Sequence, residues 1–315
     1  MNFKELPVSA FGAVMGLAGL GLALRAAAPL FPGVVRAPAY VSEPVVALGV
    51  LALAVLLSAY LLKIIYNRKA VLEEFTNPAT LGFSAALPVG MTLVAGGLAP
   101  YLASLAGIVW WAGCLLMAAL QVYGIARWLD GKVPLDKLNG GWLILLVGGI
   151  VVPGGGIGLG YAEAARFFFG FSACGAALLV PLLLARAALA APLPEALRPS
   201  WFILLVPPSL IYAHGLTFFP QALFLESLYF AGLVLAAGLL VYARGFWRWP
   251  FGPAWWAFTF PLDALAYAAT RYAQEHPSGP WKAVAGAALL AATLVVALVL
   301  ARSLAAARHL FSRRL

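Results

Sequence analysis

The sequence predicts an all-α integral membrane protein with ten transmembrane helices, and two observations lead to that prediction. The chain of 315 residues is 64% hydrophobic and only 10% charged, whereas soluble domains carry about 25% charged residues. Its mean hydropathy is accordingly high, at +0.97. The apolar residues also gather in runs of roughly 18 to 24, the length that crosses a hydrocarbon core of about 30 Å. We therefore expect one membrane domain over residues 1–315.

Ten apolar runs follow one another along the chain. They cover residues 7–24, 44–62, 80–100, 103–126, 138–160, 164–185, 200–220, 222–242, 253–270 and 280–301. Odd-numbered runs contain proline, namely Pro88, Pro153, Pro207 with Pro208, and Pro261. Proline removes a backbone hydrogen bond within a helix, so these spans are expected to bend. The first run, with proline only at its start, and the sixth, with Pro181, depart from the alternation.

The even runs are rich in Leu, Val and Ala and suit an outer, lipid-facing ring. Bent helices are tolerated at membrane depth where they are buried in protein or line a watery cavity. The alternation therefore predicts five similar helical hairpins, with the bent odd helices around one central axis.

The distribution of Lys and Arg over alternate loops predicts the orientation. With the N-terminus inside, 15 basic residues lie on the cytoplasmic side and 5 on the outer side, which together make the 20 of the composition. The outer five are Arg25, Arg36, Arg166, Arg271 and Lys282. Cytoplasmic loops of membrane proteins carry the excess of Lys and Arg, so both termini are predicted in the cytoplasm. This bias also explains the net charge of +9 without a nucleic-acid partner.

No catalytic or metal-binding constellation stands out. His214, His276 and His309 are far apart in the sequence and lack Cys, Asp or Glu at ligand spacing. Motifs for phosphate binding, a nucleophilic serine or a dinucleotide do not occur. We therefore expect permeation in place of catalysis, with no metal and no cofactor.

The ninth run carries the strongest functional signal. Phe260, Asp263 and Tyr267 recur at helical spacing beside Pro261, so one helix face presents an aromatic ring and an acid. An ionisable side chain at membrane depth is tolerated mainly where it faces the protein interior or a cavity. Phe260 is thus a candidate pore gate, and Asp263 a candidate proton or polar site. The alternatives are a core ring for Phe260 and, for Asp263, an acid bonded to a neighbouring group that holds the bend. His214 is interpreted as an interfacial side chain near the outer end of its run.

Four motifs together resemble a known family. They are PVSAFG at residues 7–12, LP at 87–88, LVPP at 205–208 and, most specifically, WAFTFP at 256–261. Over essentially the whole chain, the sequence resembles the tellurite-resistance/dicarboxylate transporter family. That family includes the bacterial TehA proteins, the malate transporters of yeast and the plant guard-cell slow anion channels.

The resemblance implies ten helices in five hairpins around a pseudo-five-fold pore, a homotrimer with one pore per protomer, and passive anion permeation. The family's gating aromatic falls on Phe260, and its pore-side glycine of the first helix on Gly12. Family members often carry proline within the first helix, where this chain has Ala-Val-Met at residues 13–15. Asp263 is not part of the family pattern, so its role stays open.

We therefore predict a passive anion channel or channel-like exporter, gated by Phe260, in a prokaryotic inner membrane. The expected cargo is small anions such as chloride and nitrate, with dicarboxylate or tellurite beyond these. The alternative is a proton-coupled secondary transporter of C4-dicarboxylates such as malate, with Asp263 as the proton carrier. A membrane scaffold or receptor without transport is disfavoured because no cytoplasmic domain is recognisable.

Overall fold

Helices make up the fold of this computed structural model, which describes residues 6–32, 38–220 and 222–312 and contains no strand within them. Eight helical stretches of these residues are long and apolar enough to cross a membrane, which supports a multi-pass membrane protein. They are Val8–Ala27, Val41–Tyr66, Pro78–Leu98, Ala103–Leu129, Ala162–Leu189, Glu195–Phe218, Phe224–Tyr242 and Gly279–Arg308.

Two of the ten predicted spans fall outside these eight. Gly141–Gly156 is apolar but shorter. The other corresponds to a 3-10 helix, η8 (Pro253–Phe258), followed by α12 (Thr259–Glu275). Asp263 and the polar end of α12 lower the hydropathy of that stretch. The count of ten spans therefore stays a prediction.

Five segments of the described chain, which we call the inner segments, change from a 3-10 helix to an α-helix along their length. They are η2 (Val8–Phe11) with α1 (Gly12–Ala27), η3 (Gly82–Ala85) with α5 (Ala86–Leu98), η5 (Gly148–Val151) with α8 (Pro153–Gly156), η6 (Glu195–Leu205) with α10 (Val206–Phe218), and η8 with α12. The fourth-listed segment has the longest 3-10 part, and the third is preceded by a short α-helix, α7 (Gly141–Val147).

The predicted prolines lie at these junctions. Pro153 opens α8, Pro207 is the second residue of α10, and Pro88 and Pro261 are each the third residue of their α-helix. The N–H groups of a first turn have no intrahelical acceptor, so proline loses no hydrogen bond there. The expected bends thus take the form of a change in helix type. The first inner segment makes the same change without proline, at Gly12.

Five longer α-helices pack on the outside of the inner segments. They are α2 (Pro38–Tyr66), α6 (Ala103–Leu129), α9 (Ala162–Leu189), α11 (Phe224–Tyr242) and α13 (Gly279–Ser312). At most 39% of the apolar window in each of these helices is buried, against 67% to 78% in the windows that contain α1, α5 and α10. The outer helices therefore present apolar side chains to the surroundings, as lipid-facing helices do.

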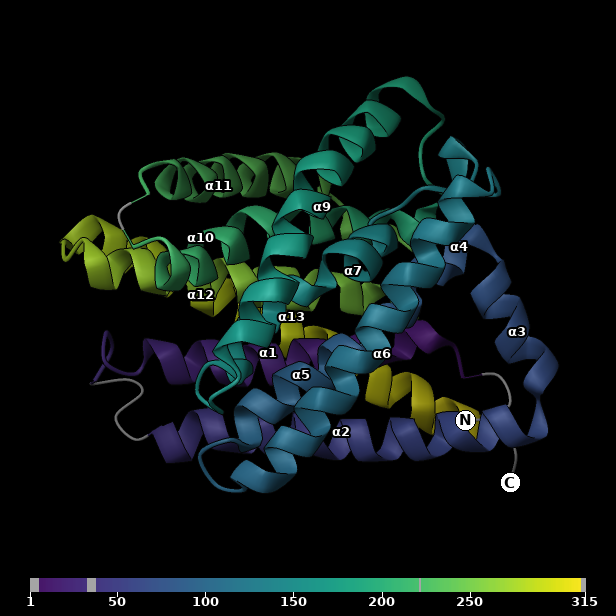
Figure 1. The fold of residues 1–315 in the computed structure, drawn as a ribbon, viewed down its shortest axis with the longest axis horizontal. Helices are drawn as coiled ribbons and strands as arrows, with labels where there is room; N and C mark the ends of the chain where they lie inside the picture. The colour runs from purple at the N-terminus through teal and green to yellow at the C-terminus, as the bar shows by residue number, and fades with distance from the viewer. Residues whose placement is uncertain (1–5, 33–37, 221, 313–315) are drawn as a thin grey trace.

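The inner segments contact one another in a closed ring. α1 contacts α5, α5 contacts α8, η5 contacts α10, α10 contacts α12, and α12 returns to α1. Each outer helix contacts the inner segment that precedes it in the chain, with α2 on α1, α6 on α5, α9 on α8, α11 on α10 and α13 on α12. In Figure 1, α2 and α11 lie at opposite edges of the bundle, and α6 and α9 cross its near face.

An ion pair between the buried Lys63 and the partly buried Glu74 fixes the start of the first inner segment. Lys63 Nζ on α2 lies 2.9 Å from Glu74 Oε1 on α3 (Arg68–Thr76) and donates to the Leu6 carbonyl at 2.8 Å. Glu74 also accepts from the Val8 N–H at 3.1 Å and from the Tyr60 hydroxyl at 2.9 Å. These bonds hold residues Leu6 and Val8, at the start of the first inner segment, against the C-terminal ends of α2 and α3.

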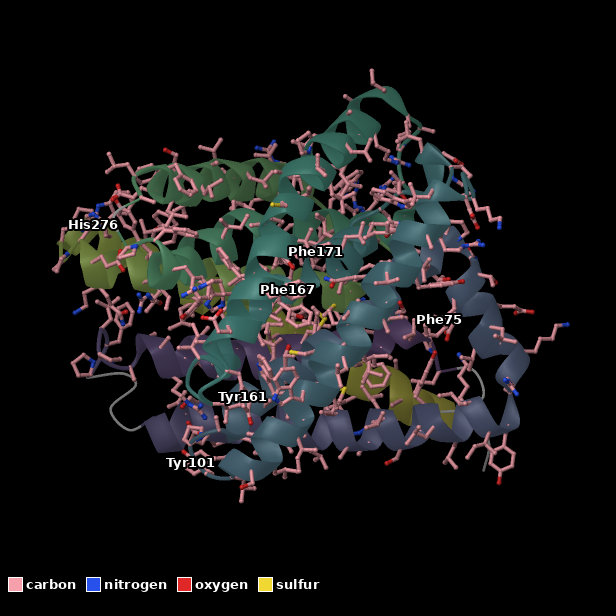
Figure 2. All side chains as sticks on the ribbon, viewed as in Figure 1. Phe75, Tyr101, Tyr161, Phe167, Phe171 and His276 are labelled. Atoms are coloured by element: carbon pink, nitrogen blue, oxygen red, sulfur yellow. The ribbon has the colours of Figure 1, made fainter. Side chains whose placement is uncertain are left out.

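The two ends of the inner segments lie at opposite ends of the molecule. Figure 2 shows His276, which follows α12, at the left edge of the molecule, and Phe75 of α3, whose neighbour Glu74 bonds the start of the first inner segment, in the right-hand part. Four of the basic residues that predicted the orientation, Lys4, Arg36, Arg313 and Arg314, lie outside the described residues.

Candidate functional site

Two cavities follow one another inside the ring of inner segments. The first, with a volume of about 40 Å³, is lined by all five inner segments near their 3-10 parts, and we call it the N-terminal cavity. The second, about 270 Å³, is lined by the same segments further along the chain, and we call it the C-terminal cavity. Because each segment contributes earlier residues to one cavity and later residues to the other, the five segments run in the same direction.

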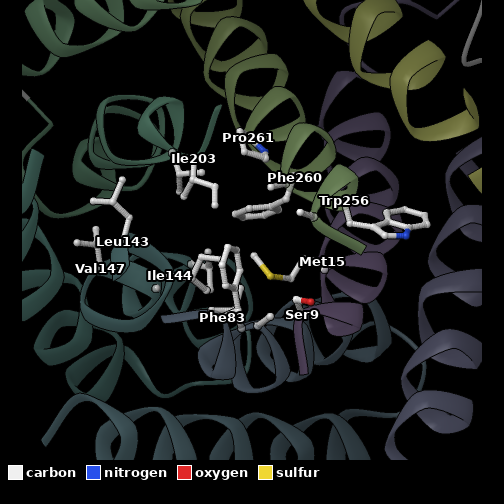
Figure 3. A pocket seen from close by; sticks show the side chains of 18 of the residues that line it. Ser9, Met15, Phe83, Leu143, Ile144, Val147, Ile203, Trp256, Phe260 and Pro261 are labelled. Atoms are coloured by element: carbon white, nitrogen blue, oxygen red, sulfur yellow. The ribbon is translucent and has the colours of Figure 1, made fainter. Parts of the chain in front are cut away.

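Phe260 stands between the two cavities. Its side chain lines both of them, as does that of Val151 on η5. Figure 3 shows the Phe260 ring in the middle of the N-terminal cavity, surrounded by side chains that include Ile203 of η6, Ile144 of α7 and Phe83 of η3. The ring therefore lies where it can separate one cavity from the other.

A row of glycines on α1 lets this helix approach α12 closely. Gly12, Gly16 and Gly19 recur on one helical face. A Cβ built on Gly12 would lie 2.9 Å from Cβ of Trp256, and one on Gly19 would lie 2.8 Å from Cδ2 of Phe260. Gly12 also lines the N-terminal cavity, and its pore-side role stays a prediction. Because these three glycines have no side chain, α1 leaves the space in which the start of α12 and the Phe260 ring lie.

Two phenylalanines of this region have different surroundings. The Phe258 ring packs edge-on against Phe202 at a centroid distance of 4.7 Å and stacks on Trp249 at 6.0 Å. No aromatic ring of the described chain makes such a contact with Phe260, which borders the two cavities instead. Both side chains are buried, but Phe258 packs among aromatic rings, whereas Phe260 borders the two cavities.

Asp263 lies one turn after Phe260 and lines the C-terminal cavity. It is only 1% exposed, and neither carboxylate oxygen has a hydrogen-bond partner among the described residues. Oδ2 faces Gly19, at 2.9 Å from the position of a built Cβ. One interpretation of Asp263 required a hydrogen bond from its carboxylate to a neighbouring group. The described residues do not provide that bond. An unpaired buried polar group is costly, which favours a functional explanation.

The C-terminal cavity also contains His214, which sequence reasoning had placed at an interface. His214 on α10 is 7% exposed, and its ring centroid lies 5.6 Å from that of Tyr267. Pro207, Leu210 and His214 recur on one helical face and all line a cavity. This helical spacing was the sequence signal that could have placed His214 on the cavity wall that Asp263 also lines. No group of three or more potential metal ligands occurs in the described ranges.

The same cavity has a cationic wall residue, Arg25 of α1, which sequence reasoning counted only for orientation. Its guanidinium faces Glu43 of α2, with Nη2 to Oε2 at 2.7 Å and Nε to Oε1 at 3.0 Å. Glu43 is not among the residues that line this cavity and instead borders a groove between α2 and the end of α5.

The predicted prolines divide into two groups. Pro207 and Pro261 line the N-terminal cavity. Pro88 and Pro153 lie at their helix junctions and not on either cavity wall, and Pro208 faces Gly232 of α11. The N-terminal cavity wall is otherwise almost entirely apolar, with Ser9 as its one hydroxyl side chain in the described chain.

Comparison with known proteins gives a consistent result. A family model described as SLAC1, voltage-dependent anion channel, matches residues 5–304. The S-type anion channel SLAH3 of Arabidopsis thaliana is 25% identical over 297 residues, covering 92% of this chain and 46% of the relative. SLAH2 of the same plant is 29% identical over 248 residues, which cover 76% of this chain and 47% of SLAH2. The guard cell S-type anion channel SLAC1, also from Arabidopsis thaliana, is 27% identical over 288 residues, which cover 86% of this chain and 51% of that relative. The chain thus spans about half the length of the curated relatives it matches.

Proposed function

This chain belongs to the SLAC1 family of voltage-dependent anion channels, as its motifs predicted, and from this membership we propose that it is a passive channel for small anions. Ten transmembrane helices form five hairpins, and the five inner segments surround a pseudo-five-fold pore. The closed ring of contacts and the parallel direction of the inner segments support this arrangement.

One observation carries the proposal: two cavities lie in line inside the ring, and Phe260 lines both. In the proposed mechanism this ring closes the path, and its displacement joins the cavities into one pore. The apolar wall of the N-terminal cavity binds an anion weakly, which suits conduction because an ion must leave as readily as it enters.

The cargo and surroundings follow from the family and the charge distribution. The Arabidopsis relatives are named as S-type anion channels, and chloride and nitrate are the anions we expect here. Dicarboxylate and tellurite are further candidates from the resemblance. With both termini in the cytoplasm, the C-terminal cavity opens toward the outside of the cell. A prokaryotic inner membrane and a homotrimer with one pore per protomer stay predictions.

The test is anion flux through purified protein in sealed liposomes. Chloride, nitrate and malate are supplied one at a time, and empty liposomes give the background. We expect chloride and nitrate to pass, and more so in Phe260→Ala. Failure of both the natural protein and Phe260→Ala to pass any of the three anions would contradict the channel proposal.

A second candidate is proton-coupled transport of C4-dicarboxylates. A single acid makes a poor proton pathway, so this function needs a second titratable group near Asp263 within the membrane. The side chains of His214 and Tyr267 line the same cavity as Asp263, which supplies candidates for such a partner. Passive conduction remains the preferred function because all the matched relatives are named as channels.

A further inference from the structure

The guanidinium of Arg25 lies between the C-terminal cavity and the carboxylate of Glu43. Arg25 lines the cavity, whereas Glu43 borders a separate groove between α2 and the end of α5, together with Gly97 and Tyr101. The side chains of the pair are 23% and 19% exposed, so neither is fully solvated. The carboxylate therefore approaches the cation from behind, on the side away from the cavity.

The hydrogen bonds of Arg25 leave one donor without a protein partner. A guanidinium has five N–H groups. Nε and Nη2 donate to Glu43, Nη2 also donates to the Gly97 carbonyl at 3.1 Å, and Nη1 donates to the Gly96 carbonyl at 3.4 Å. The remaining N–H, on Nη1, has no partner among the described residues. A bound anion can accept a hydrogen bond from it.

Arg25 is also the cationic side chain on this wall. Of the described residues that line the C-terminal cavity, the formally charged ones are Arg25 and Asp263, and His214 is the other basic group. A cation held in place on the wall of a low-dielectric cavity raises the local concentration of anions. A carboxylate in bidentate contact reduces that effect without abolishing it.

We propose that Arg25 recruits anions into the C-terminal cavity and that Glu43, behind it, sets how strongly they bind. This inference rests on the proposed channel function. A bare arginine at this position would hold an anion and slow its passage, and an uncharged side chain would admit cations as readily as anions. The paired arginine gives the weak anion preference that conduction requires.

A purely structural role for the pair predicts a different pattern. In that case any substitution of Arg25 would destabilise the protein, because its hydrogen bonds to the carbonyls of Gly96 and Gly97 hold the end of α5 to α1. Loss of Arg25 or of Glu43 would then lower stability. The two losses would not change the affinity for anions in opposite directions.

The experiment uses the full chain with Phe260→Ala as the background, so that the pore conducts. Arg25→Gln and Glu43→Gln are compared for chloride flux against external chloride concentration, and for reversal potential in a KCl gradient. Removing or exposing one unit charge at the cavity wall is expected to shift the half-saturating chloride concentration about threefold to tenfold. We expect the shift upward in Arg25→Gln, with lower selectivity for chloride over potassium. We expect it downward in Glu43→Gln.

The matched controls are Arg166→Gln and Glu163→Gln. These residues form an exposed pair on α9, at 3.5 Å, and do not line the cavity. They should leave both measurements unchanged, and Arg25→Lys should preserve the selectivity for chloride because the charge remains. Shifts in the same direction, or no shift, in the two pore variants would overturn the inference. If neither the natural protein nor Phe260→Ala passes chloride, nitrate or malate, the proposed function fails instead.

Discussion

Gly19 of α1 and Phe260 of α12 meet at the boundary between the two cavities. A Cβ on Gly19 would lie only 2.8 Å from Cδ2 of the Phe260 ring, closer than side-chain atoms normally approach. The ring thus occupies a space that exists because position 19 has no side chain. The gate position therefore depends on two helices that are far apart in the sequence.

The first prediction tests this contact by adding one methyl group. Gly19→Ala should lower the stability of the protein by about 1 to 3 kcal/mol, because the ring must move in a packed interior. In a Phe260→Ala background Gly19→Ala should cost much less stability. The cost that remains comes from Asp263 Oδ2, which lies 2.9 Å from a Cβ built on Gly19. The measurement is the apparent melting temperature in detergent. Gly170→Ala on α9 is the control, since a Cβ there meets nothing within 4 Å. Equal costs in the two backgrounds would show that the ring does not fill this space.

The second prediction compares two phenylalanines. Phe260→Ala should raise chloride flux and lower stability less than Phe258→Ala, since the Phe260 ring borders two cavities and makes no aromatic contact in the described chain. Phe258→Ala should leave flux no higher and cost about 3 to 5 kcal/mol, as truncation of a core phenylalanine does. Liposome flux and melting temperature measured on both variants separate a gate from a core residue. A poorly folded, non-conducting Phe260→Ala protein would favour the core interpretation.

The helical class and the division into buried and exposed helices could be predicted from the sequence. Proline spacing separated the inner segments from the outer ones, because each proline stands in the first turn after a 3-10 segment. The 3-10 segments themselves could not be predicted, since they depend on close packing between helices. The first inner segment shows this, because it has no proline at its junction and changes helix type at Gly12, which packs against Trp256.

The candidate site was predicted in part. Phe260 and Asp263 stood out because a ring and an acid one turn apart are unusual in an apolar run. Arg25 and His214 did not, since their importance comes from reaching one cavity from α1 and α10, a relationship that no local pattern encodes. Glu43 was missed for the same reason, because its bonds to Arg25 cross between helices.

The third prediction concerns topology. Pro134, after α6, and Pro277, after α12, are both exposed loop residues. Cysteines placed at these positions in a Cys174→Ala background should react with an impermeant reagent from the cytoplasmic and outer sides respectively, as the charge bias predicts. Cys174 is removed because it is exposed, whereas Cys114 is buried and can stay. Labelling of both positions from one side of intact cells would contradict the ten-span topology.

The last prediction separates passive conduction from proton coupling, and it depends on Asp263. An ionised Asp263 repels an anion in the C-terminal cavity, whereas a protonated one does not. In a passive channel the acid does not need to change its state during transport, so Asp263→Asn should conduct normally and a pH gradient should not move the chloride reversal potential. In a coupled transporter the acid must gain and lose a proton in each cycle. A pH gradient should then drive malate or chloride uphill into sealed liposomes, and Asp263→Asn should abolish that accumulation.

The controls for this test are Asp130→Asn and His214→Gln. Asp130 is an exposed acid beside Lys132, outside the cavities, so its amide variant should match the natural protein in every assay. His214 lines the cavity with Asp263, so in a coupled transporter its loss should also weaken uphill uptake. We expect no uphill uptake by the natural protein, because the matched relatives are named as channels. Accumulation that follows the pH gradient and disappears in Asp263→Asn but not in Asp130→Asn would replace the channel with a proton-coupled transporter.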